Sequence, residues 1–251
     1  MSDAPTRSKR TAVLGGAGGI GRVLIDELQE RGHETIALDL AASLARHQLG
    51  GQTIAIDICD EASIAAAFAE LGADGKGLDG FVNLAGYNAA LMPLAEMDTG
   101  YFDDVIAGNL RGAFLAARAA KPLLASRTGS SLVMVSSGLA HHVRQGYGAY
   151  SASKAAVIAM TKTLALEWAP SVRVNAVAPG LVDTAFLRGG TGRSAEDGEP
   201  LVDLDAYRNA TPMARIATPG DVTGPIRFLL GTDSGFMTGQ VLWVNGGGYM
   251  P

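Results

Sequence analysis

VLGGAGGIG, residues 13–21, joins a β-rich run to a helical pattern over residues 22–30. Glycines permit a sharp turn, and they let backbone N–H groups approach a pyrophosphate at a helix N-terminus, where the helix dipole also favours an anion. Two spacings overlap here, GxGxxG from Gly16 and GxxxGxG from Gly15. The residues expected to contact a dinucleotide in this turn are Gly15, Gly18, Gly19, Ile20 and Gly21.

Short β-rich runs alternate with helical patterns along the rest of the chain. The runs expected to be strands are 11–15, 34–39, 52–57, 79–84, 130–136, 172–178 and 240–244. Such alternation predicts an α/β fold, a Rossmann-type doubly wound parallel sheet of seven strands with helices on both faces. We expect a flexible tail over 1–10 and a single domain over 11–251. Within 97–126, Gly108 and Gly112 interrupt the helical spacing and predict two consecutive helices.

Composition excludes several classes of protein. The chain has 251 residues, of which 47% are hydrophobic and 18% charged, with a formal net charge of −5 and no basic run. These values argue against nucleic acid as a partner, and no apolar stretch is long enough to cross a membrane. One cysteine allows no internal disulfide, which favours a reducing, cytoplasmic location. The four histidines lack zinc-ligand spacing, so we expect no metal site.

Asp39 stands at the end of the second expected strand. In a dinucleotide site, a carboxylate at this position accepts hydrogen bonds from the adenosine ribose 2′-hydroxyl and repels a 2′-phosphate. The sequence therefore favours NAD over NADP as cofactor. Arg46 leaves NADP open, because its guanidinium would bind a 2′-phosphate if it turned toward the site.

Tyr150 and Lys154 are four residues apart at the start of an alanine-rich segment. On a helix, this spacing places both side chains on one face. A phenol titrates near pH 10, so it exchanges a proton at neutral pH only where its phenolate is stabilised. The neighbouring ammonium group is placed to do this. The alternative is that Tyr150 packs in the core and Lys154 is a solvated charge.

Residues 185–211 form a polar, glycine-containing stretch in which the alternation of strands and helices lapses. In a compact domain, a long insertion of this kind is either a lid over a site or a disordered decoration. We expect the lid.

These motifs together resemble the short-chain dehydrogenase/reductase family over nearly the whole chain. The motifs follow in order: the GxxxGxG turn, Asp57, Asn83-Leu84-Ala85-Gly86, Asn109, Ser137, Tyr150 with Lys154, and Pro179-Gly180. Two positions depart from the family pattern. Leu14 replaces the usual threonine before the glycine turn, and Leu84 replaces the usual second asparagine. Both exchange hydrogen bonds for apolar packing and affect the positioning of the cofactor.

The resemblance implies a role for each matching residue. Tyr150 is the expected general acid/base, Lys154 lowers its pKa and binds the nicotinamide ribose, and Ser137 holds the substrate oxygen. Asn109 is expected to support a water that relays protons from Lys154. The other expected cofactor contacts are Asp57 and Ile58 at the adenine, Asn83, Ala85 and Gly86 at the middle, and Pro179, Gly180, Val182 and Thr184 at the nicotinamide. Structural alternatives remain: caps at Ser137 and Asn109, and a simple turn at Pro179-Gly180.

The expected activity is NAD-dependent interconversion of a secondary alcohol and a ketone. Positions that follow the fourth, fifth and sixth strands are expected to face the substrate: Asn88, Leu139, His142, Gln145, Tyr147 and Phe186. A polyol or sugar, a cyclic alcohol, a steroid-like ring and a 3-hydroxyacyl thioester all remain open. The alternatives are a 3-oxoacyl-thioester reductase that uses NADPH and a non-catalytic NAD-binding regulator. The resemblance also implies a homo-oligomer, a tetramer or a dimer, formed through helices 97–126 and 150–169 and through the C-terminal strand.

Overall fold

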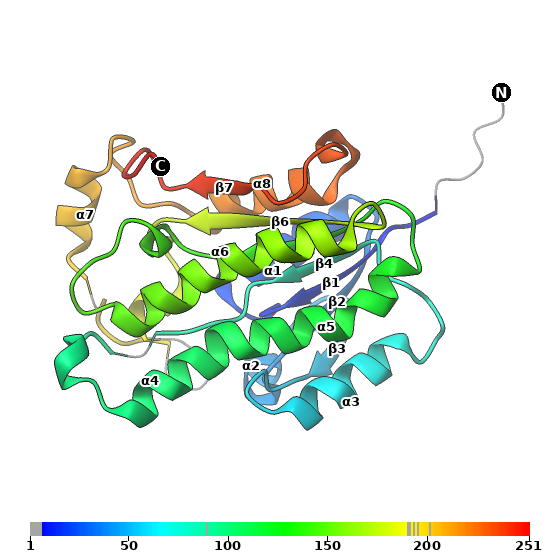
Figure 1. Cartoon of the computed structure of the whole chain (residues 1–251), viewed down its shortest axis with the longest axis horizontal. Helices are drawn as coiled ribbons and strands as arrows, with labels where there is room; N and C mark the ends of the chain where they lie inside the picture. Colours follow the sequence, from blue (N-terminus) through cyan, green and yellow to red (C-terminus); the bar gives the residue numbers. More distant parts are fainter. Residues whose placement is uncertain (1–6, 89, 190–191, 193, 195, 201) are drawn as a thin grey trace.

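A computed structural model describes residues 7–88, 90–189, 192, 194, 196–200 and 202–251. Its centre is one parallel sheet with the strand order β3-β2-β1-β4-β5-β6-β7 (Figure 1). The strands are β1 Arg10–Leu14, β2 Glu34–Asp39, β3 Gln52–Ala55, β4 Gly80–Asn83, β5 Ser130–Val135, β6 Val172–Pro179 and β7 Val241–Val244. All seven expected strands are present, and the predicted doubly wound sheet is confirmed. The direction of winding reverses between β1 and β4.

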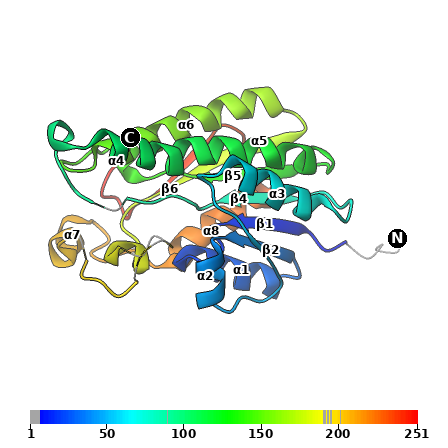
Figure 2. The same ribbon diagram turned by 90° about the horizontal axis from the view of Figure 1, so that it is seen from below.

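Helices cover both faces of the sheet (Figure 2). One face packs against α3 (Glu61–Gly72), α5 (Gly112–Ala125) and α6 (Gly148–Trp168), and the other against α1 (Gly19–Glu30) and α8 (Pro219–Leu230). Shorter helices are α2 (Ala41–Arg46), α4 (Thr99–Ile106) and α7 (Leu204–Ala210). In β1, Leu14 belongs to the first core and Val13 to the second, both essentially unexposed. This alternation on two buried faces explains why the strands are almost continuously apolar.

The predicted interruption at Gly108 and Gly112 takes an unexpected form. The two helices α4 and α5 do occur, but the residues between them, Ala107–Arg111, form a π-helical turn, so the path stays helical throughout. A side chain at Gly108 would overlap the Tyr87 ring, and one at Gly112 would lie 2.7 Å from the Ile58 carbonyl oxygen. The glycines therefore serve close approach to two loops and do not end a helix.

No helix within the part of the chain that the structure describes is long and apolar enough to span a membrane. The expected tail over 1–10 is shorter than predicted at its inner end, because β1 begins at Arg10. Residues 1–6 lie outside the described residues.

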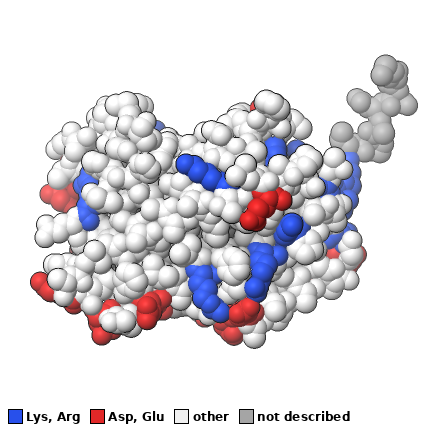
Figure 3. Space-filling view, viewed as in Figure 1, with Lys and Arg blue, Asp and Glu red and all other residues white. Residues whose placement is uncertain are grey.

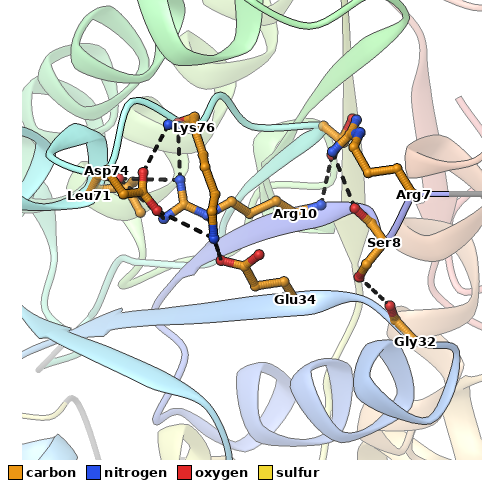
Figure 4. A network of polar contacts seen from close by, with 9 residues as sticks. Arg7, Ser8, Arg10, Gly32, Glu34, Leu71, Asp74 and Lys76 are labelled. Carbon is orange, nitrogen blue, oxygen red and sulfur yellow. Dashed lines mark hydrogen bonds and ion pairs between the residues drawn. The ribbon is translucent and has the colours of Figure 1, made fainter.

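Arg10 is the buried charge at the amino end of the sheet, with 2% of the residue exposed (Figure 4). Its guanidinium donates to the carbonyl oxygen of Leu71, near the end of α3, and to that of Lys76 at 3.1 Å. It also pairs with Glu34 at 3.0 Å and with Asp74 at 3.3 Å. A cation at this helix C-terminus satisfies carbonyl groups that have no partner inside the helix. The interaction fastens α3 to β1 and β2.

We expect Arg10→Met to destabilise the protein by about 3 kcal/mol, because it leaves buried carbonyl groups without donors. Urea unfolding measures this change. Arg31→Met is the matched control: Arg31 is exposed, and its side chain donates to the Glu27 carbonyl oxygen of the preceding helix, so its loss should cost less than about 0.5 kcal/mol. Equal effects of the two substitutions would contradict the role assigned to Arg10.

Candidate active site

A cavity of about 790 Å³ opens at the carboxyl ends of the strands, where the winding reverses between β1 and β4. Residues from the ends of β1, β2, β5 and β6 line it, together with the loops that follow these strands and the loops after β3 and β4. This edge is where doubly wound sheets bind ligands, and the size suits a dinucleotide fragment with a small molecule.

The glycine turn forms one end of the cavity. Gly15 has a φ of 80°, and the N–H groups of Gly15 and Gly16 donate to the Leu38 carbonyl oxygen, which ties the turn to β2. A side chain at Gly21 would overlap the Gly15 carbonyl oxygen, so helix α1 begins in direct contact with the turn. The first turn of α1 carries no acidic residue. The predicted residues Gly15, Gly18, Gly19, Ile20 and Gly21 all line the cavity.

Asp39 lines the same end from β2. Its carboxylate accepts from the N–H of Ala17 at 2.9 Å and from that of Leu40 at 2.8 Å. Burial raises the pKa of Asp39, and the hydrogen bonds from Leu40 and Ala17 oppose this increase. Arg46 does not line the cavity. Its guanidinium forms an ion pair with Glu196 at 2.8 Å. Sequence reasoning missed Arg22, which lines this end and donates to the Ala17 carbonyl oxygen at 3.0 Å.

Ser137, Tyr150 and Lys154 meet at the middle of the cavity. Two hydrogen bonds fasten α6 to the end of β5: Ser136 Oγ donates to the Lys154 carbonyl oxygen at 2.7 Å, and Lys154 Nζ donates to the Val135 carbonyl oxygen at 3.0 Å. Ser137 forms a side-chain hydrogen bond with Tyr150, and its Oγ also accepts from the Leu139 N–H at 3.2 Å. The predicted common face of α6 is confirmed, because Lys154 Nζ lies 5.7 Å from the centroid of the Tyr150 ring.

Two predicted site residues, Asn83 and Asn109, do not line the cavity. Asn83 is buried, and its Oδ1 accepts from the Ala85 N–H at 3.1 Å. Asn109 Oδ1 accepts from the Tyr87 N–H and its Nδ2 donates to the Tyr87 carbonyl oxygen, both at 2.8 Å. The amide of Asn83 therefore shapes its own loop, and contact of Asn83 with the cofactor stays a prediction. Asn109 holds the loop after β4 and caps no helix, while its part in a proton relay stays a prediction.

The remaining predicted cofactor residues all line the cavity: Asp57, Ile58, Ala85, Gly86, Pro179, Gly180, Val182 and Thr184. Thr184 lies directly against Gly19: a Cβ atom at position 19 would lie 2.7 Å from the Thr184 methyl group. The loop after β6 thus meets the glycine turn, and the two predicted ends of a dinucleotide site belong to one continuous wall.

The predicted substrate residues also line the cavity: Asn88, Leu139, His142, Gln145, Tyr147 and Phe186. Among the lining residues that sequence reasoning did not assign to the substrate are Tyr207, Asn245 and Tyr249. The Tyr249 ring stacks on His142 with centroids 5.3 Å apart, and its hydroxyl lies 3.2 Å from His141 Nδ1. The C-terminal stretch therefore folds over its own cavity. The only signal for it was the glycine run at 246–248, just after the last strand.

Described residues of the stretch 185–211 also face the cavity. They include the short helix Ala185–Arg188 and α7, whose Tyr207 hydroxyl accepts from the Leu181 N–H at 2.9 Å. Five residues of the predicted lid lie outside the described residues: Gly190, Thr191, Arg193, Ala195 and Leu201. That the stretch opens and closes as a lid stays a prediction.

Comparison with known proteins identifies the family. Residues 15–249 match the family model described as enoyl-(acyl carrier protein) reductase. An uncharacterized short-chain type dehydrogenase/reductase of Sinorhizobium fredii is 32% identical over 98% of this chain, which spans 45% of that protein's length. The chain is a short-chain dehydrogenase/reductase. This is an oxidoreductase family that binds nicotinamide cofactors and acts on CH–OH donors.

Two further members of comparable size resemble this chain. D-threitol dehydrogenase of Mycolicibacterium smegmatis is 32% identical, over 95% of this chain and 92% of its own. The ligand-free structure of Thermoplasma acidophilum aldohexose dehydrogenase superimposes with a TM-score of 0.86 and 28% identity, over 96% of this chain and 94% of its own.

This dehydrogenase/reductase compensates for its two departures from the family pattern by packing. Leu14 is buried in the first core and Leu84 packs against the second. The backbone of Leu84 donates to the Leu14 carbonyl oxygen at 2.8 Å, so the glycine turn and the loop after β4 remain joined. The residues present fit a nicotinamide dinucleotide, because the glycine turn has no room for side chains and Asp39 faces the same end of the cavity.

Burial sets the protonation of the central pair. It raises the pKa of Tyr150 to about 12, opposed by the hydrogen bond with Ser137. It lowers the pKa of Lys154 to about 8, and only 4% of this residue is exposed. Burial therefore governs the pKa of both groups, and the expectation that Lys154 lowers the pKa of Tyr150 stays a prediction. A low-dielectric site of this kind strengthens the effect of any further charge.

We expect Lys154→Met to stabilise the protein at pH 7 by about 2 kcal/mol, since it removes a buried charge whose cost exceeds the lost hydrogen bond to Val135. Between the folded pKa of about 8 and the higher unfolded value, the unfolded chain binds more protons. Stability of the parent protein then rises with pH, and the gain should shrink at pH 9.5. Unfolding at both pH values measures this. Lys162→Met changes an exposed position on α6 and should alter the free energy of unfolding little at either pH. A stabilisation by Lys154→Met that does not depend on pH would contradict the role assigned to burial.

Proposed function

We propose that this protein is an NAD-dependent oxidoreductase that interconverts a secondary alcohol and a ketone by hydride transfer. The observation that carries the proposal is the meeting of Ser137, Tyr150 and Lys154 in one cavity with the glycine turn and Asp39. Membership of a family that acts on CH–OH donors supports it.

In this proposal, NAD supplies the hydride acceptor when an alcohol is oxidised and the donor, as NADH, when a ketone is reduced. Tyr150 exchanges a proton with the substrate oxygen. Ser137, which is hydrogen-bonded to the Tyr150 hydroxyl, holds the substrate oxygen in place. Lys154 is buried beside the Tyr150 ring, and its protonated ammonium group stabilises the Tyr150 phenolate. Asn109 acts as a positioning residue through the backbone of Tyr87.

NAD is favoured over NADP by the charges at the adenosine end of the cavity. Asp39 presents a carboxylate there, and Arg46 is engaged by Glu196. The Asp39 carboxylate would repel a 2′-phosphate, and the Arg46 guanidinium would not bind it because it is paired with Glu196. A 2′-hydroxyl, in contrast, would donate a hydrogen bond to Asp39. Arg22 also lines this end, but its guanidinium donates to the Ala17 carbonyl oxygen.

Two other functions are less well supported. The description of the matching family model favours a thioester reductase, but such an enzyme is expected to use NADPH, against which Asp39 argues. A non-catalytic NAD-binding regulator has no need of a proton-transfer group, and this chain keeps Ser137, Tyr150 and Lys154 together.

Polyhydroxylated alcohols are the substrate class we propose. The wall around Tyr150 offers Asn88, Gln145, Tyr147 and Asn245, side chains that donate and accept hydrogen bonds as hydroxyl groups require. Relatives named for D-threitol and for aldohexoses lend the same support. Screening NAD reduction at 340 nm with polyols, sugars, cyclic alcohols, hydroxysteroids and 3-hydroxyacyl thioesters tests the class.

We expect Tyr150→Phe to lower kcat by about 10²–10⁴-fold, because it removes the proton-transfer group and leaves the ring in place. NADH binding, followed by nicotinamide fluorescence, should persist. The matched variant Tyr147→Phe removes a neighbouring phenol of the same wall and should change KM more than kcat. A Tyr150→Phe enzyme with near-normal kcat would sink the mechanism.

A homo-oligomer is also proposed, formed through the outer faces of α4, α5 and α6. Phe102, Phe114 and Leu166 on these helices are 37%, 46% and 84% exposed. On the face that Figure 3 shows, acidic and basic side chains are scattered among wide uncharged areas. Such a surface suits association with a second copy through apolar contact.

Light scattering of the parent protein should therefore give a multiple of the 25.8 kDa chain mass. Leu166→Glu should shift the population toward the monomer, because it would bury a charge in the contact, while the circular dichroism spectrum stays unchanged. A parent protein that is monomeric at all concentrations would overturn the proposal.

A further inference from the structure

Glu196 brings a second carboxylate to the adenosine end of the cavity. It comes from the stretch between β6 and α8, and it lines the cavity together with Asp39. One of its oxygens lies 2.8 Å from Arg46 Nη1, and the carboxylate lies 3.1 Å from His47 Nε2. Neither Arg46 nor His47 lines the cavity. Glu196 therefore stands between the cavity and two basic side chains.

The same corner contains Asp39. His47 is close enough to Asp39 to act electrostatically on its carboxylate, and Ser43 of α2 forms a side-chain hydrogen bond with it. Gly192, from the same stretch as Glu196, also lies at this corner. A Cβ atom at position 192 would be 2.9 Å from Ser43 Oγ and 4.0 Å from Asp39 Oδ1. The stretch between β6 and α8 therefore touches the part of the cavity where a ribose 2′-substituent is expected.

We propose that Glu196 is a second determinant of cofactor choice beside Asp39, because it engages Arg46 and His47 and keeps both from binding a 2′-phosphate. The proposal rests on the function proposed above and deepens its cofactor assignment. Asp39 repels the phosphate directly, whereas Glu196 removes the groups that would attract it. Guanidinium binds phosphate strongly through paired N–H donors, so an unengaged Arg46 at this corner would favour NADP.

The contact matters more for selection than for stability. Side chains of Arg46 and Glu196 are 41% and 26% exposed, and ion pairs of this exposure contribute little to folding. Burial raises the pKa of Glu196, but its hydrogen bonds with His47 and Arg46 outweigh this and lower it, so the carboxylate is charged at neutral pH. Replacing Glu196 should therefore leave the fold intact and release both basic groups from its carboxylate, with the weak hydrogen bond from Arg46 to the Ser194 carbonyl oxygen at 3.5 Å remaining.

The test measures Kd for NADH and NADPH by nicotinamide fluorescence in the full-length protein. Glu196→Gln keeps the size of the side chain and removes its charge. We expect Kd for NADPH to fall roughly tenfold, the effect of one added charge-assisted hydrogen bond, while Kd for NADH stays the same. The double variant Glu196→Gln/Arg46→Gln should return Kd for NADPH toward the parent value. Glu199→Gln, an exposed glutamate of the same stretch, is the matched control and should change neither constant.

An unchanged ratio of the two constants in Glu196→Gln would overturn the proposal. So would a gain in NADPH affinity that survives when Arg46 and His47 are both replaced by Gln together with Glu196, because it would come from neither basic group. Loss of NADH binding in Glu196→Gln would likewise assign Glu196 a structural role only. A parent protein that prefers NADPH would overturn the NAD assignment itself, whereas parent preference for NADH with no response to Glu196→Gln overturns only the role of Glu196.

Discussion

The turn between β1 and α1 is the constraint on which the rest of the site depends. It must pass from strand to helix within residues 15–18, and the Gly15 carbonyl oxygen leaves no space for a side chain at Gly21. Its N–H groups fasten it to Leu38 and Asp39 of β2, while Gly19 packs on Thr184 from the loop after β6. One backbone turn therefore aligns three strand ends, and glycines are required in it because side chains would not fit between segments that lie so close.

Chemistry and stability oppose each other at Lys154. Its buried ammonium group donates a hydrogen bond to the Val135 carbonyl oxygen, and burial lowers its pKa to about 8. Arg10, at the other end of the sheet, is buried as deeply but meets carbonyl groups and two carboxylates. A structural cation is given partners, whereas the cation beside Tyr150 is left with little compensation. A group held in this way responds to new charges brought into the cavity.

The sequence was sufficient for the sheet because buried parallel strands are short, apolar and separated by helices of regular spacing. It also located the residues at strand ends, since their position along a strand decides which edge they reach. It did not show where a side chain points: Asn83 and Asn109 match family motifs, and in the structure both amides form hydrogen bonds with backbone groups of the loop after β4, while their expected roles stay predictions. Contacts between distant segments were also missed, such as Arg46 with Glu196, 150 residues apart.

These misses share a physical origin. Tyr150 and Lys154 lie on α6 and Ser137 lies two residues after the end of β5; two hydrogen bonds to backbone carbonyl groups join α6 to this strand end, so the geometry follows from local structure. Tyr207, Glu196 and Tyr249 reach the cavity from segments outside the regular βα alternation, whose course depends on contacts made only in the folded chain. Such segments change without disturbing the strands beneath them. Under the proposed function, the groups for proton transfer therefore depend on the packing of β5 and α6, whereas Glu196, Tyr207 and Tyr249 depend on segments that vary independently of it.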